Sequence, residues 1–340
     1  MRTQPTDLSL SLLRDTVIEH WGLTDPQLTY LPLGFGSHHW NVVDAASGER
    51  WFATVDDHRN PRMVVTPAAS LDALRRAMRT AAALHDEAGL AFVLAPTPNR
   101  EGGVLRSIGA TAYSIVLFPY VEGTSAPYGA FASEADRLET LRLVGRVHAA
   151  TGLVPEGLPR RETFLIPRRE DLFVLLDDLE APWESGPYAE GARDLLRANR
   201  GDILRAFVRY DALVAAVEAD PEPWVVTQGE PHAGNILRTT AGMLLLVDWD
   251  TCMLGPKERD LWMLDEGPAT DWTVYLEETG ATTVSRRVID LYRMWWDLCE
   301  ISEFASWFRA PHEATEDTAI GWNALNGYLP IDPAYLELAG

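Results

Sequence analysis

Val225-Val-Thr-Gln-Gly-Glu-Pro-His-Ala-Gly-Asn-Ile-Leu237, followed by Leu244-Leu-Leu-Val-Asp-Trp-Asp250, is the stretch that decides the fold. An apolar strand leads to a loop with a carboxylate at Glu230 and an amide at Asn235, and a second apolar strand ends in Asp248. Phosphoryl transfer needs this set of groups. One carboxylate orients the attacking hydroxyl, while an amide oxygen and a second carboxylate hold the Mg²⁺ that bridges the phosphates. The stretch therefore predicts a phosphoryl-transfer site.

The rest of the chain divides into a strand-rich first part and a helical remainder. After a helical segment at 8–21, short alternating runs are separated by Gly-containing turns, which is typical of antiparallel strands. From Ser133 onward apolar residues recur mostly at helical spacing. Strands first and helices later predict an α+β, two-lobed protein. The predicted strands are 28–33, 40–44, 50–55, 92–94, 103–108, 112–118, 224–227 and 243–247, and the predicted helices are about 70–84, 133–152, 188–218, 257–265, 284–309 and 316–328.

Gln228-Gly-Glu-Pro-His-Ala-Gly-Asn235, then Val247-Asp-Trp-Asp250, resembles the catalytic loop of the aminoglycoside phosphotransferase and choline kinase superfamily. That family writes His-Gly-Asp-x-x-x-x-Asn, then apolar-Asp-Trp-Glu/Asp, and has the protein-kinase-like fold. The resemblance covers about residues 28–310 and is strongest in 224–262. It implies an ATP-dependent O-phosphotransferase, with GTP as the alternative donor and Mg²⁺ as the metal.

The resemblance implies a role for each matching position of the loop. Glu230 stands where the family has its catalytic Asp, so the carboxylate is kept on a side chain longer by one methylene. His232 stands where protein kinases place a phosphate-contacting Lys, and we expect both residues to act in catalysis. Asn235 and Asp248 match the two metal ligands, Asp250 matches the acid that follows them, and we expect all three to belong to the metal site.

Three more positions bear on the same resemblance. Gln228 stands where the family has His. Asp260, in Gly255-Pro-Lys-Glu-Arg-Asp-Leu261, matches an Asp that is structural in the family. His148, at the end of the first large-lobe helix, also fits the family's pattern.

The first part of the chain carries the expected nucleotide-covering elements. Leu33-Gly-Phe-Gly-Ser-His-His-Trp-Asn41 lies between two strands, where its glycines let backbone N–H groups approach an anion. Pro and Gly break the strand pattern in Phe118-Pro-Tyr-Val-Glu-Gly-Thr124, which we interpret as the hinge. The predicted parts are an antiparallel-sheet N-lobe (1–118), the hinge (119–124) and a mostly helical C-lobe with the catalytic loop and acceptor site (125–340), and the predicted nucleotide-binding residues are Gly34, Gly36, Ser37, His38, Phe118, Tyr120 and Val121.

One family feature is absent. Kinases carry a lysine on the third strand that pairs with phosphates and with a helix glutamate. The matching position here is Thr54, and the first 118 residues contain no lysine. The helix that should offer the glutamate carries arginines instead, so both partners of the ion pair are missing together. The candidates to replace the lysine are Arg75, Arg76 or Arg79, and alternatively His38 and His39.

Acidic residues after the catalytic loop are candidate acceptor ligands. Asp297, Glu300 and Glu303 share one helical face near Trp296 and Trp307. Acids with aromatic rings suit a cationic acceptor, and a solvated acidic helix face is the alternative interpretation. The predicted acceptor residues are Asp265, Glu266, Asp297, Glu300 and Glu303.

Composition narrows the classes of partner. The formal net charge is −21, which repels nucleic acid and anionic membranes and attracts cations. We therefore expect a cationic small-molecule acceptor, with no nucleic-acid or membrane partner. Cys252 and Cys299 make no disulfide framework, and Met1 to Leu10 lack a signal-peptide pattern, so a cytoplasmic protein is expected.

The leading prediction is an O-phosphotransferase acting on a cationic antibiotic, which would confer resistance or self-protection. The acceptors considered are an aminoglycoside, an aminocyclitol such as spectinomycin, a basic peptide antibiotic and an amino sugar. A nucleotide-binding pseudokinase is one alternative, because Glu230 replaces Asp and the lysine is missing. A metabolite kinase of the sugar, choline or homoserine type is another. Asn235 and Asp248 argue against an inactive scaffold, which would have little use for metal ligands.

Overall fold

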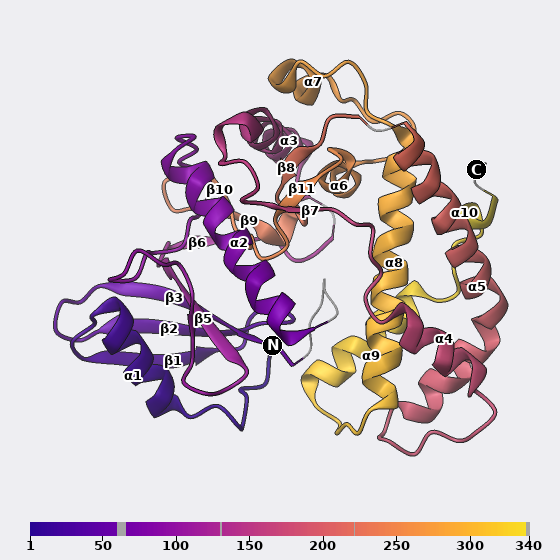
Figure 1. Ribbon diagram of the computed structural model, residues 1–340, viewed down its shortest axis with the longest axis horizontal. Coiled ribbons are helices and arrows are strands. Elements are labelled where there is room, and N and C mark those ends of the chain that lie inside the picture. Colours follow the sequence, from indigo (N-terminus) through magenta and orange to yellow (C-terminus); the bar gives the residue numbers. More distant parts are fainter. Residues whose placement is uncertain (60–65, 130, 221, 338–340) are drawn as a thin grey trace. The chain divides into compact units, whose positions relative to one another are not determined.

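The computed structural model describes residues 1–59, 66–129, 131–220 and 222–337, which divide into two compact units (Figure 1). The first unit holds the described residues up to Glu162 together with Trp224–Val284. The second holds those of Thr163–Pro223 and those from Ser285 onward. The named strands all belong to the first unit, and the second is built of helices. This arrangement confirms the predicted α+β class.

A five-stranded antiparallel sheet opens the first unit, in the order β1-β2-β3-β5-β4. Successive residues of a strand point to opposite faces. On one face Trp40 and Val55 pack against α1 (Leu10–Trp21). On the other face Phe118 packs with α2 (Pro67–Asp86). The strands are β1 Pro26–Leu31, β2 His38–Asp44, β3 Arg50–Asp57, β4 Arg106–Ser107 and β5 Tyr113–Pro119.

The remainder of the first unit holds two small sheets, in the orders β10-β9-β6 and β7-β11-β8. These sheets join segments that are far apart in the chain, and the fully buried Trp249 belongs to the core that they share with α2. The elements are β6 Gly123–Thr124, α3 Glu134–Ala149, β7 Arg160–Arg161, β8 Val225–Thr227, β9 Ile236–Thr239, β10 Leu244–Leu246, β11 Met253–Gly255, α6 Glu258–Leu261 and α7 Thr273–Thr279, with 3₁₀ turns at Ala150–Leu153, Ala233–Asn235 and Trp262–Leu264.

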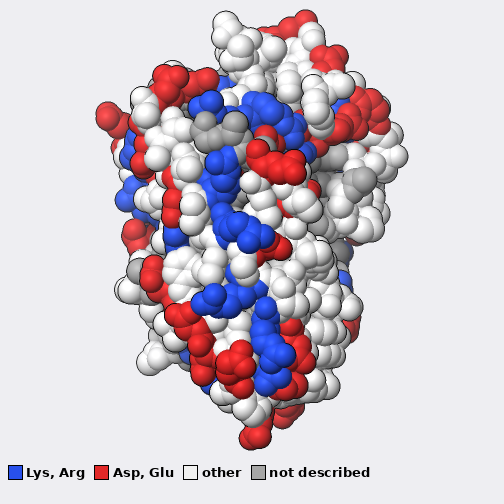
Figure 2. Space-filling view, turned by 90° about the vertical axis from the view of Figure 1, so that its right-hand side faces the viewer, with Lys and Arg blue, Asp and Glu red and all other residues white. Residues whose placement is uncertain are grey.

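Helices α5 and α8 pack along each other in the second unit. Figure 2 shows a band of basic side chains with acidic side chains at its edges. In this unit arginines form ion pairs with nearby acids, as in Arg169–Asp211 at 2.6 Å and Arg200–Asp177 at 2.7 Å, so much of their charge is balanced locally. The helices are α4 Arg169–Asp177, α5 Ala189–Ala219, α8 Arg286–Arg309, α9 Glu316–Tyr328 and α10 Pro333–Glu337.

Most predicted elements are present, but one predicted strand is absent and another is shorter than predicted. Residues 92–94 form no strand, because only Val93 makes an isolated bridge, to Leu246. Of 103–108, only Arg106–Ser107 pairs with β5. Of the predicted hinge at 119–124, residues 120–122 link β5 to β6, and the lobe boundaries placed around it stay a prediction. Within the described ranges no helix is both long enough and apolar enough to cross a membrane. Helices α4, α7 and α10 and strands β6, β7, β9 and β11 were not predicted from the sequence.

Trp40 tests the core between the first sheet and α1. Its side chain is buried, and its indole N–H has no hydrogen-bond partner among the described residues. Trp40→Ala should lower the free energy of unfolding by about 3–5 kcal/mol because it leaves a large cavity. Trp40→Phe should cost less than about 1.5 kcal/mol, since it keeps most of the ring volume and removes an unsatisfied donor. Urea denaturation measures both, with the exposed Leu10→Ala as control. Equal losses for Phe and Ala would contradict this packing.

Candidate active site

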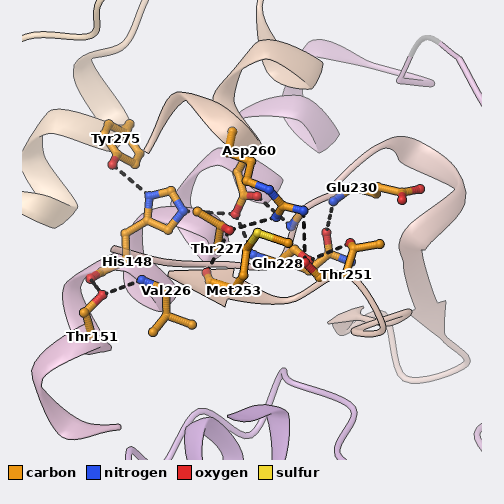
Figure 3. Close-up of polar contacts among 12 residues, drawn as sticks. His148, Thr151, Val226, Thr227, Gln228, Glu230, Thr251, Met253, Asp260 and Tyr275 are labelled. Carbon is orange, nitrogen blue, oxygen red and sulfur yellow. Dashed lines mark hydrogen bonds and ion pairs between the residues drawn. The ribbon is translucent and has the colours of Figure 1, made fainter. Parts of the chain in front are cut away.

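A buried carboxylate at Asp260 organises the catalytic loop (Figure 3). It accepts hydrogen bonds from the backbone N–H groups of Gln228 at 2.8 Å and Gly229 at 2.7 Å. Nε2 of His148 lies 3.0 Å from the same carboxylate, and Nδ1 of His148 lies 2.8 Å from the hydroxyl of Tyr275. Asp260 thus ties the loop that follows β8 to α3, α6 and α7, which agrees with the structural role that the sequence predicted for it.

Gly229 is required where the loop crosses this cluster. Its φ of 109° lies in the region that favours glycine. A Cβ atom there would lie 2.3 Å from Oγ1 of Thr251 and 2.6 Å from Nη1 of Arg259. Arg259 is itself buried and donates to Oγ1 of Thr227 at 2.9 Å and to the carbonyl of Thr251 at 3.0 Å. Neither Thr251 nor Arg259 was predicted to support the site: Thr251 follows the Asp-Trp-Asp motif, and Arg259 lies in the Gly255–Leu261 segment, of which only Asp260 was assigned a role.

Gln228 connects the loop that carries Glu230 to the segment that carries Asp248. Its Nε2 donates to the carbonyls of Val247 at 2.9 Å and Asp248 at 2.5 Å. Its Oε1 accepts the backbone N–H of Glu230 at 2.6 Å. One amide side chain therefore sets the backbone at both the predicted catalytic carboxylate and a predicted metal ligand. The sequence marked Gln228 only as a departure from the family, and this positioning role needed the structure to find it.

Glu230 and His232 lie beside each other in the loop. The carboxylate of Glu230 points away from the buried cluster in Figure 3, and its Oε2 lies 4.0 Å from Nε2 of His232. Nδ1 of His232 accepts the N–H of Gly234 at 3.1 Å, and the ring meets Tyr128 edge-on at 4.7 Å between centroids. Burial lowers the pKa of His232 to about 4. His232 is therefore neutral at pH 7, unlike the lysine that protein kinases place there.

Asn235 presents an oxygen that suits a metal ion. Its Nδ2 donates to the carbonyl of Glu230 at 3.0 Å, and its backbone carbonyl accepts from Val247 at 3.0 Å. The amide oxygen of its side chain accepts no hydrogen bond from the described residues. With the amide nitrogen held in place, that oxygen is available to a hard cation such as Mg²⁺.

Asp248 adds an unusual backbone and a concentration of negative charge. Its φ of 60° is uncommon for a residue other than glycine and is typical of functional positions. Burial among protein atoms raises the pKa of Asp248 most. The negative charges of Asp250, Glu230 and Asp56 raise it further. Its side chain still reaches solvent, so water screens part of this repulsion. A divalent cation would relieve the rest, and the donor chemistry therefore fits Mg²⁺.

The metal assignment itself stays a prediction. Within the described part of the chain, no three His, Cys, Asp or Glu side chains are placed to hold a metal together. The predicted set of Asn235, Asp248 and Asp250 instead combines an amide with two acids.

The glycine turn leads into β2 beside β3. Gly34 and Gly36 have φ values of 64° and 100°, which allow the tight turn. The hydroxyl of Ser37 donates to Oδ1 of Asp56 in β3 at 2.6 Å. Nδ1 of His38 lies 3.2 Å from the hydroxyl of Tyr30, so this ring faces β1.

The position of the missing lysine is occupied by neutral groups. Thr54 is opposite His39 in the β2–β3 register, and its Oγ1 lies 3.4 Å from Nδ1 of that ring. Burial lowers the pKa of His39 to about 3, so the imidazole is neutral at pH 7. Arg76 donates to the carbonyls of Gly157 at 2.6 Å and Pro159 at 3.2 Å. These contacts direct Arg76 toward the 157–159 loop.

The predicted hinge residues lie at the end of β5. Phe118 is buried and is paired with Phe52 in the sheet register. The guanidinium of Arg50 lies 3.8 Å above the ring of Tyr120, and Val121 packs against the core. No described contact tests whether these residues bind adenine.

The predicted acceptor acids have protein partners of their own. In the first unit, Asp265 accepts from the hydroxyl of Thr270 at 2.7 Å, and Glu266 lies 3.1 Å from Nε of Arg137. In the second unit, Glu303 lies 2.8 Å from Nε of Arg168.

Asp297 and Glu300 lie on α8 in the second unit. Burial raises the pKa of Asp297 to about 7, and a hydrogen bond from Tyr335 of α10 partly opposes that rise. The negative charge of Glu300 adds to the effect on Asp297. Asp297 therefore carries only part of a charge at neutral pH, and acceptor binding by this set stays a prediction.

Residues 40–292 match the phosphotransferase enzyme family. The chain is 32% identical over 262 residues to Protein StrN of Streptomyces griseus, which covers 73% of this chain and 74% of that protein.

Solved structures agree on the fold. Spectinomycin phosphotransferase APH(9)-Ia, in complex with ADP and spectinomycin, superposes with a TM-score of 0.72 at 16% identity and covers 98% of each chain. Choline kinase LicA from Streptococcus pneumoniae gives a TM-score of 0.53 at 12% identity, over 94% of this chain and 98% of that one. These likenesses confirm the predicted protein-kinase-like fold.

Gln228→Leu tests the amide that joins the two halves of the site. The change leaves two carbonyls and one N–H without their partner, and each such buried group costs about 1–3 kcal/mol. We expect the free energy of unfolding to fall by roughly 2–5 kcal/mol in urea denaturation. The same change at Gln27, which lies at the surface, should stay within about 0.5 kcal/mol of wild type. Similar values for the two variants would rule out this role of Gln228.

His232 should make stability depend on pH. Its folded pKa of about 4 lies below the unfolded value of 6.5, so protonation favours the unfolded state. This contribution is complete above pH 6.5 and is lost as the pH falls from 6.5 through 4. Denaturation at pH 7 and pH 4 should show a larger loss for wild type than for His232→Asn, by at most about 3 kcal/mol. Identical pH dependence in the two proteins would show that His232 is not buried as described.

Proposed function

The chain belongs to the phosphotransferase enzyme family, and we propose that it transfers the γ-phosphoryl group of ATP to a hydroxyl of a cationic antibiotic. It is an enzyme, a phosphotransferase with an alcohol group of a small molecule as acceptor. The observation that carries the proposal is the loop of Glu230, Asn235 and Asp248, whose backbone is fixed by the buried contacts of Gln228 and Asp260. A preorganised set of this kind is what phosphoryl transfer requires.

In this proposal, different residues of the loop bind the metal, orient the acceptor and contact the phosphates. Asn235, Asp248 and Asp250 would hold Mg²⁺, which neutralises phosphate charge when bound. Glu230 would orient the acceptor hydroxyl and accept its proton. Its backbone N–H is fixed by Gln228, which limits the misplacement that a longer side chain brings. His232, neutral at pH 7, would supply an N–H to a phosphate oxygen rather than a charge.

Two considerations support an antibiotic acceptor and ATP as donor. One solved structure of the same fold is a spectinomycin phosphotransferase in complex with ADP and spectinomycin. The net charge of −21 favours a cationic acceptor over an anionic one. A protein that modifies an antibiotic in this way would confer resistance or self-protection.

A substrate panel tests the proposal. The purified protein, with Mg²⁺ and ATP, is incubated with spectinomycin, several aminoglycosides, a basic peptide antibiotic, choline and homoserine, and ADP release is measured with mass spectrometry of each acceptor. We expect one cationic antibiotic to gain a single phosphoryl group. Phosphorylation of choline or homoserine alone would indicate a metabolite kinase. Nucleotide binding with no acceptor phosphorylated would indicate a pseudokinase.

Glu230→Gln tests the catalytic carboxylate. It keeps the size of the side chain but cannot accept a proton, so kcat should fall about 100-fold or more. The affinity for Mg²⁺–ADP in calorimetry should change by less than about threefold, because the carboxylate acts on the acceptor side. Glu230→Asp should keep part of the activity. The exposed Glu156→Gln serves as the matched control. Wild-type turnover by Glu230→Gln on the true acceptor would exclude this role.

A further inference from the structure

We propose that the aromatic ring of Tyr128 forms part of the acceptor site and contacts the cationic acceptor beside Glu230, an inference that rests on the proposed function. Tyr128 lies between β6 and α3, and the sequence patterns assigned it no role. The residue is 59% exposed, although its ring is large and mostly apolar. An exposed aromatic ring at the edge of a reaction site is a surface that a ligand can cover.

The segment that carries Tyr128 lies along the catalytic loop. The ring of Tyr128 meets the ring of His232 edge-on, with 4.7 Å between the centroids and 72° between the planes. Two residues before Tyr128, the carbonyl oxygen of Ala126 lies 3.6 Å from the position that a Cβ atom would take on Gly234. Two separate contacts therefore place residues 126–128 against residues 232–234, and both segments belong to the first unit.

His232 relates Tyr128 to the predicted catalytic carboxylate. Oε2 of Glu230 lies 4.0 Å from Nε2 of His232. Nδ1 of the same imidazole accepts the N–H of Gly234, which fixes how the ring lies. Glu230 and Tyr128 thus lie beside one imidazole ring. An acceptor whose hydroxyl contacts Glu230, and which extends past His232, reaches the ring of Tyr128.

The chemistry of this pair of groups favours a cation. The face of an aromatic ring attracts an ammonium group that lies within about 6 Å of its centroid. The carboxylate of Glu230 adds a negative charge on the other side of His232. A tyrosine ring also packs against the C–H surface of a sugar or cyclitol. Tyr128 would therefore help to hold the body of a cationic acceptor while Glu230 orients its hydroxyl.

Calorimetric titration of the protein loaded with Mg²⁺ and ADP measures acceptor binding without turnover. The probes are spectinomycin, kanamycin and choline. For each probe that wild type binds, Tyr128→Ala should weaken binding roughly three- to thirtyfold, because the aromatic face is lost. Tyr128→Phe keeps the ring and should stay within about twofold of wild type. Tyr128→Leu keeps an apolar side chain without a ring, so it should bind nearly as weakly as Tyr128→Ala.

Steady-state kinetics separates acceptor contact from a merely structural role. In Tyr128→Ala the KM for the phosphorylated probe should rise by the factor seen in calorimetry, while the KM for ATP stays within about twofold of wild type. Leu153→Ala is the matched control, because Leu153 is also 59% exposed and lies in the first unit. This control should leave both KM values as in wild type.

The results that would overturn the role of Tyr128 differ from those that would overturn the proposed function. If folded Tyr128→Ala or Tyr128→Leu, verified by its melting curve, binds the probes as wild type does, the aromatic contact is refuted and the proposed function stands. An equal rise in the KM values for ATP and acceptor would also refute it.

Failures of wild type concern the proposed function itself. Binding of choline alone, weakened by Tyr128→Ala, would keep the role of Tyr128 and refute the antibiotic acceptor. If wild type binds no Mg²⁺–ADP, or binds it but none of the three probes, the proposed site is refuted, and the role of Tyr128 with it.

Discussion

The buried carboxylate of Asp260 is the constraint on which the rest of the site depends. A charged group removed from water must be compensated by hydrogen bonds or opposite charge. Asp260 obtains its compensation from the backbone of Gln228 and Gly229 and from His148. Because those donors come from the catalytic loop and from α3, the same contacts that stabilise the charge also fix where the loop lies. The glycine at 229 follows from this, since no side chain fits there.

The loop fixed in this way concentrates negative charge on its outer side. Asp248 is influenced by Asp250, Glu230 and Asp56, and the side-chain oxygen of Asn235 is kept available by the bond that its nitrogen makes. Such an arrangement costs stability in the protein alone and gains it when a cation binds.

The departures from the family are local and compensated. Gln228 makes three hydrogen bonds that hold both sides of the site, which shows that the family's His is not the only side chain that can serve at this position. At Thr54 the lysine and its helix partner are both missing, so no unpaired charge is left behind. His39 lies beside Thr54 as a neutral ring, tilted by 30° against the ring of Phe52.

The sequence by itself determined the α+β class, most helices and the residues of the catalytic loop. These features depend on neighbours in the chain, because apolar periodicity and the spacing of Glu230, Asn235 and Asp248 are local patterns. The short strands β6, β7 and β11 escaped it, since two or three residues carry no periodicity and each pairs with a distant segment. The prediction of a strand at 92–94 was wrong. The apolar residues there pack in the core, and only Val93 forms a β-bridge, to Leu246. Tertiary structure alone decided that Gln228 bridges to Asp248, that His232 is neutral, and that the negative charge of Asp56 raises the pKa of Asp248. Each of these three features depends on burial or on charges brought together from remote parts of the chain. None of them can be predicted from one residue and its neighbours in the sequence.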